Sequence, residues 1–107
     1  MSLLYVRDPI QRAAMHAEVA TVAIDLPPLT GLPEQTWVAR VGTGAPAMDY
    51  RDGRTLATIH GVQHEEPNRP IAYGWVVTVW DGSNPITPPG GIYFAELSDA
   101  MATGVAR

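Results

Sequence analysis

Residues 71–82, which read IAYGWVVTVWDG, give the clearest strand pattern in the sequence. Side chains alternate between the two faces of an extended chain. One face would carry Ile71, Tyr73, Trp75, Val77 and Val79, and the other Ala72, Gly74, Val76, Thr78 and Trp80. Both faces are largely apolar, which is typical of a central strand that is covered on both sides. The pattern therefore predicts that this strand lies inside a sheet, with Trp75 in the core.

A helix is expected near the N-terminus. Asp8 can cap free backbone N–H groups, and Pro9 at the first helical position loses no hydrogen bond. Apolar or small side chains then share one helical face: Ile10, Ala13, Ala14, Ala17, Thr21 and Ile24. We expect this face in the core and a helix from Pro9 to at least His16. Residues 19–26 also alternate as a strand would, so both a helix and a strand are kept open there.

Further strands are expected at residues 36–41, 55–63 and 92–97, and residues 3–6 are either an edge strand or an unstructured start. Residues 42–53 carry three glycines and one proline and predict a long, mobile loop, with a turn at Asp52-Gly53. Residues 100–105 predict a last short helix. Helices do not alternate with the strands, which argues against a parallel sheet.

The expected fold is therefore a single α+β domain over residues 1–107. Its antiparallel sheet should have about four or five strands. An N-terminal helix and a short C-terminal helix complete it.

Composition narrows the classes of partner. The chain has a net charge of −4, and its seven basic residues are scattered arginines with no lysine, which argues against nucleic acid. It has no cysteine, which excludes disulfides and thiolate metal sites and favours a reducing, cytoplasmic compartment. The apolar start is interrupted by Arg7 and Asp8, so it predicts neither a signal peptide nor a membrane span.

Charged residues make up only 17% of the chain, against about 25% in typical soluble domains. So few charges leave apolar surface that another chain can cover. We therefore expect a homo-oligomer or a protein partner. Trp80, beside the turn at Asp81-Gly82, is the expected contact residue, with Val76 and Thr78 on the same face of the strand.

The pair His60 and His64 is the first candidate for a metal site. Four residues apart on a helix, they would share a face and could bind one metal ion. They fall on an expected strand, where a rise of about 3.3 Å per residue puts them roughly 13 Å apart. We therefore expect neither a metal nor a cofactor.

Two functions follow from these observations. The first is a non-enzymatic interaction or assembly protein, acting as a homo-oligomer or as a small subunit of a larger particle. The alternative is a small enzyme or ligand-binding domain that holds a small apolar molecule. Its pocket would be bordered by His60, His64 and Tyr73, with Asp49 as a further polar group. The sequence carries no recognisable nucleophile motif, which favours binding over catalysis.

Overall fold

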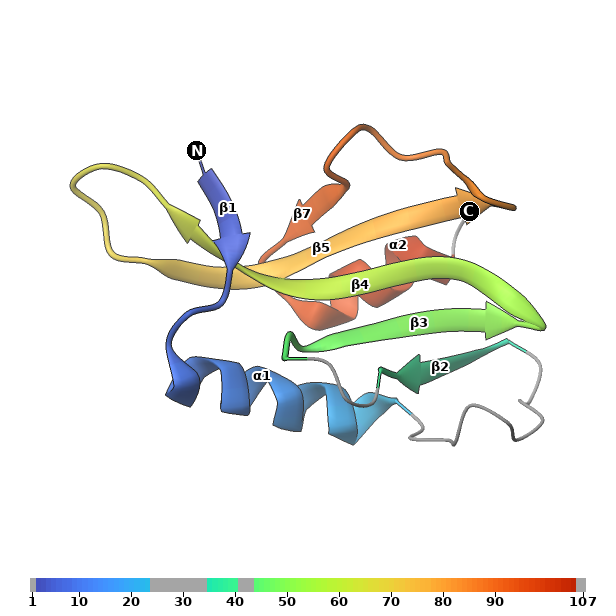
Figure 1. The fold of residues 1–107 in the computed structure, drawn as a ribbon, viewed down its shortest axis with the longest axis horizontal. Helices are drawn as coiled ribbons and strands as arrows, with labels where there is room; N and C mark the ends of the chain where they lie inside the picture. Colours follow the sequence, from blue (N-terminus) through green and yellow to red (C-terminus); the bar gives the residue numbers. More distant parts are fainter. Residues whose placement is uncertain (1, 24–34, 41–43, 106–107) are drawn as a thin grey trace.

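The computed structural model describes residues 2–23, 35–40 and 44–105. Along the chain the elements are β1 (Ser2–Tyr5), α1 (Pro9–Val22), β2 (Thr36–Ala39), β3 (Ala47–Asp52), β4 (Arg54–Glu65), β5 (Ala72–Asp81), β6 (Asn84–Pro85), β7 (Ile92–Phe94) and α2 (Leu97–Val105) (Figure 1). The expectations for Ile24, for the strand alternative at residues 24–26 and for Val41 lie outside the described residues.

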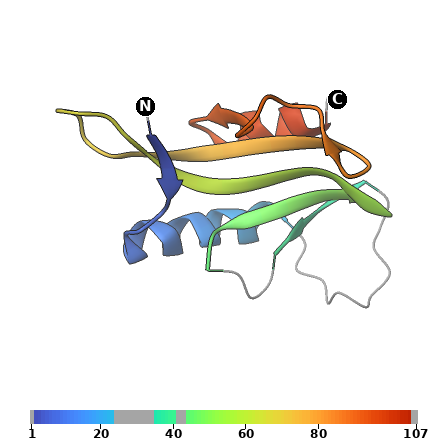
Figure 2. The same cartoon turned by 45° about the horizontal axis from the view of Figure 1, so that its top comes forward.

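The strands form one antiparallel sheet, which confirms the predicted α+β class. Its order is β2-β3-β4-β5-β6, while β1 also pairs with β4 and β7 with β5. The described part of the chain contributes seven strands to it, so the prediction of four or five was too low. The edge-strand alternative at residues 3–6 is confirmed by β1, within one residue of its predicted bounds. One additional strand, β6, has only 2 residues, too few for alternation to reveal it. The hairpin that joins β4 to β5 projects beyond β1 (Figure 2).

The other additional strand, β3, lies within residues 42–53, where the sequence predicted a mobile loop. That prediction was wrong for residues 47–52. Met48 is fully buried beside Ile59 of β4, whereas Asp49 faces the other side of the sheet. A buried carboxylate obscures the hydrophobic alternation, and the long-range pairing with β4 provides the strand's hydrogen bonds. The turn at Asp52-Gly53 was predicted correctly, with Gly53 at a φ of +72°.

Helix α1 begins as predicted, because Asp8 Oδ1 accepts a hydrogen bond from the Ile10 N–H at 2.9 Å. The helix runs to Val22, so the strand alternative was wrong for residues 19–22. The predicted core face was also wrong: Met15 and Val19 are buried, whereas Ile10 is 77% exposed. The larger side chains of Met15 and Val19 remove more apolar area from water than a face rich in alanine.

Both described helices pack on the same face of the sheet, which makes the molecule a two-layer structure. In Figure 1, α2 passes behind β4 and β5. The core between the layers includes Val6, Met15, Val19, Met48, Ala57, Ile59, Trp75, Val77, Val79, Leu97 and Ala100. Trp75 is 2% exposed, as predicted. Trp37 is half-buried and packs against this core, close to Gly104 of α2.

The opposite face of the sheet has no described helix on it, and we call it the helix-free face. Alternation along the paired strands β3, β4 and β5 defines its side chains: Ala47, Asp49, Thr58, His60, Val62, His64, Val76, Thr78 and Trp80. The segment before β7 covers part of it, since a side chain at Gly91 would collide with Val76. Neither helix has the length and apolar character that a membrane span requires, as far as the described residues go.

Candidate ligand-binding groove on the helix-free face

Strand β4 exchanges one neighbour for another near its middle. Its first half pairs with β3, ending at the pair Ala47–His60, and its last part pairs with β1, from the pair Tyr5–Val62 onward. Between the two pairings, the Gly61 N–H donates to the Pro46 carbonyl at 2.8 Å. β1 and β3 therefore meet the same edge of β4 one after the other, and the side chain of His60 lies where they change over.

Two cavities open at this point, and both are lined by Tyr5 and His60. The larger has a volume of about 370 Å³ and is lined by Leu4, Tyr5, His60, Val62, Val76 and Gly90. The smaller has a volume of about 220 Å³ and is lined by Tyr5, Arg40, Ala45, Ala47 and His60. We call the two together the His60 groove. None of these lining residues is acidic, and most are apolar, as is usual for ligand pockets.

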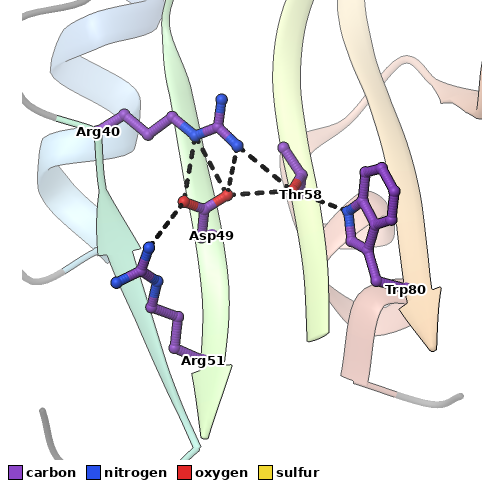
Figure 3. Close-up of polar contacts among 5 residues, drawn as sticks. All are labelled: Arg40, Asp49, Arg51, Thr58 and Trp80. Atoms are coloured by element: carbon purple, nitrogen blue, oxygen red, sulfur yellow. Dashed lines mark hydrogen bonds and ion pairs between the residues drawn. The ribbon is translucent and has the colours of Figure 1, made fainter. Parts of the chain in front are cut away.

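A polar network fixes Arg40 at one end of the groove (Figure 3). Its Nε donates to both oxygens of the buried Asp49 carboxylate, at 3.2 and 3.1 Å, and its Nη2 donates to Oδ1 at 2.8 Å. The Thr58 hydroxyl donates to the same Oδ1 at 3.1 Å. Trp80 Nε1 in turn donates to the Thr58 oxygen at 3.1 Å. The chain of contacts crosses β3, β4 and β5 and holds the guanidinium in one orientation.

The charges in this network do not balance. Arg51 Nη2 lies 3.9 Å from Asp49 Oδ2, so two arginines face a single carboxylate. The Arg40 side chain is 43% exposed, so water screens this charge in part. The third nitrogen of its guanidinium, Nη1, points away from Asp49 in Figure 3. Arg40 therefore brings one positive charge to the smaller cavity, which it lines.

The imidazole of His60 borders both cavities. Burial and the nearby positive charge of Arg40 lower the pKa of its imidazole below the ordinary value, burial having the larger effect. The ring is therefore neutral at neutral pH. A neutral imidazole has one nitrogen that donates and one that accepts a hydrogen bond.

Six of the seven residues selected from the sequence lie on the helix-free face. His60 lines the groove, Asp49 binds the groove residue Arg40, and Thr78 and Trp80 lie further along β5. Val76 lines the groove but is buried within the chain, so it offers little surface to a protein partner.

Tyr73 is the exception. It pairs with Gln63 and packs against the core on the helix-covered face, so it cannot border a pocket with His60. The sequence shows which residues of one strand share a face. It does not show which face of a neighbouring strand lies on the same side, since that depends on register.

His64 shares the face of His60 but not its groove. It lines a separate cavity of about 320 Å³ at the β4–β5 hairpin, with Glu66, Arg69 and Ile71 among its neighbours. Its ring also lies edge-on to that of Tyr93, with centroids 5.6 Å apart. The described part of the chain has no cluster of three or more His, Cys, Asp or Glu side chains placed to hold a metal ion.

Tyr5 and Arg40, the groove residues that carry polar groups besides His60, were not selected from the sequence. Asp49 lies opposite Val38 in the β2–β3 pair, and the Arg40 N–H donates to the Ala47 carbonyl, so a hairpin interpretation would have placed Arg40 diagonally across from Asp49. Assigning residues 42–53 to a loop concealed that pairing. Tyr5 lies on a four-residue strand whose partner is far along the chain, so local sequence carries no signal for its position.

No family model, no curated protein and no solved structure matches this chain.

Proposed function

We propose that this protein is a non-enzymatic binding module that holds a small ligand with an apolar body in the His60 groove. The observation that carries the proposal is a pair of neighbouring cavities, about 370 and 220 Å³ in volume, that share Tyr5 and His60 as lining residues. The larger volume lies near the lower end of the range of roughly 300–1,000 Å³ for small-molecule sites. Apolar walls with a few placed polar groups are what such sites use for affinity and orientation.

The polar groups favour binding over catalysis. Asp49 already accepts hydrogen bonds from Arg40 and Thr58, so its oxygens are occupied within the protein. General acid–base catalysis needs a group that can reach the substrate's proton. The pKa of the His60 imidazole is lowered, chiefly by burial, and the lining residues named above include no Ser, Thr, Cys or Lys that it could activate as a nucleophile.

Replacing Tyr5 by alanine should weaken binding of an apolar probe, octan-1-ol, about tenfold, because one aromatic wall of both cavities is lost. Tyr5 is 74% exposed, so the fold should lose little stability. Isothermal titration calorimetry measures the affinity. Ile71→Ala is the matched control, because Ile71 is an exposed apolar residue that lines the separate cavity at the β4–β5 hairpin. Equal affinity in Tyr5→Ala and the natural protein would place the probe elsewhere.

Self-association is a second candidate function, and one observation favours it. The apolar stripe of α1 that the sequence assigned to the core faces solvent instead, with Ile10 77% exposed and Ala13, Ala14 and Ala17 exposed beside it. Together with the low charge fraction, this stripe is a surface that a second copy of the chain can cover.

The association proposal predicts a dimer or larger species at micromolar concentration, measured by light scattering after size exclusion. Ala14→Arg should convert it to a monomer, since a charge would then be buried at the contact. Arginine keeps helix propensity high, so α1 should remain folded. Ala102→Arg on the exposed side of α2 is the control and should leave the mass unchanged. A monomeric natural protein at high concentration would contradict the proposal.

A further inference from the structure

We propose that the ligand of the His60 groove carries a carboxylate, which binds between Arg40 and His60 while its apolar part fills the cavity lined by Val62 and Val76. This inference rests on the proposed function and specifies its ligand class. It is carried by the arrangement of charge, donors and apolar walls around the groove.

The charge at one end of the groove is complementary to an anion. Among residues 2–23, 35–40 and 44–105, Asp49 is the acidic partner of both Arg40 and Arg51, and no acidic side chain lines the groove. The two arginines and one carboxylate sum to one positive charge, in a chain whose net charge is −4. One net charge matches a single carboxylate, whereas a phosphate dianion would leave a charge unpaired at the site.

Arg40 is preorganised for this contact. Asp49 holds its Nε and Nη2, and Asp49 is itself held by Thr58, which accepts from Trp80. The guanidinium therefore has little side-chain freedom to lose when a ligand binds, which removes part of the usual entropic cost. Its Nη1 remains to donate to a ligand oxygen, and the cavity that Arg40 lines is the one that His60 also lines.

His60 supplies the second contact. A neutral imidazole can donate its N–H to the other carboxylate oxygen. Arg40 and Tyr5 line the smaller cavity together with His60, and Asp49 lies on the same face of β3, two residues from Ala47, the partner of His60. The partner of His60 on β5, Val76, is uncharged. A bound carboxylate would offset the positive charge of Arg40, which is one cause of the lowered pKa of His60.

The pKa of His60 should therefore rise on binding, so the complex takes up protons. The affinity is then highest below the pKa of free His60. It falls as the pH rises through the window between the free and the bound pKa.

The test compares three probes of equal chain length, octanoate, octan-1-ol and octylamine, by calorimetry on the full chain. Octanoate should bind about tenfold more tightly than octan-1-ol, as expected for one charge-assisted hydrogen bond, and octylamine most weakly. Equal affinities for octanoate and octan-1-ol would overturn the carboxylate and leave the apolar groove standing. No binding of any probe would overturn the proposed function itself.

Two variants assign the effect to the named residues. Arg40→Gln should lower octanoate affinity about tenfold and leave that of octan-1-ol unchanged, whereas Arg54→Gln, a charge-matched control away from the groove, should change neither. If Arg40→Gln does not fold, His60→Gln tests instead whether the carboxylate binds in the groove beside His60. It keeps an N–H donor, so octanoate should still bind, but the dependence of affinity on pH between about 5 and 8 should disappear. A retained pH dependence would contradict the role of His60.

Discussion

Trp75→Ala should destabilise the protein by about 3–5 kcal/mol, the usual cost of removing a large buried aromatic side chain. Trp75 is 2% exposed and lies between Gly61 of β4 and Phe94 of β7, in the core under both helices. Its removal would leave a cavity that the paired strands cannot close by collapsing. That loss is a large share of the stability of a small domain.

Trp80 provides the matched comparison on the same strand. It is half-buried on the helix-free face and donates its Nε1–H to Thr58. Trp80→Ala should cost about 1–2 kcal/mol, from one hydrogen bond and partial burial. Denaturant unfolding of the two variants measures the difference. An equal loss of stability in both would mean that the helix-free face is as much core as the opposite one.

Met48→Ala should cost about 2–5 kcal/mol, because Met48 is fully buried and packs in the core beside Ile59. The result distinguishes a strand at residues 47–52 from the loop that the sequence predicted there. Met101→Ala, at a half-buried position of α2, is the control and should cost less. A change of only a few tenths of a kcal/mol at Met48 would restore the loop interpretation.

What the sequence could predict depended on local signals. The two apolar faces of β5 identified the centre of the sheet, and the Asp8-Pro9 cap placed the start of α1 to the residue. Both signals arise within a few residues along the chain, so they can be recognised without knowing which distant residues each segment contacts. The buried state of Trp75 followed from the same alternation.

What the sequence could not predict depended on contacts distant in the chain. Asp49 is buried because Arg40 and Thr58 bind its carboxylate, and neither contact can be inferred from an acidic residue in a glycine-rich stretch. The exposed position of Ile10 likewise follows from which side of α1 meets the sheet. The groove was partly anticipated through His60, but Tyr5 reaches it only through the pairing of β1 with the far end of β4.

The Arg40–Asp49–Thr58–Trp80 network also bears on the earlier expectation that Trp80 is a contact residue. Its indole nitrogen is engaged inside the protein, so a partner could meet only the rest of the ring. The network's clearest consequence is the fixed guanidinium at the groove. For this reason the ligand proposal depends on Arg40 and His60, while association depends on the separate surface of α1.

The most direct test of the central claim is a backbone amide chemical-shift titration of the full chain with octan-1-ol. The account predicts saturable shifts concentrated at the groove residues Tyr5, Ala47, His60, Val62 and Val76. Shifts concentrated along α1 or at the β4–β5 hairpin near Ile71, or no saturable shifts at all, would contradict it.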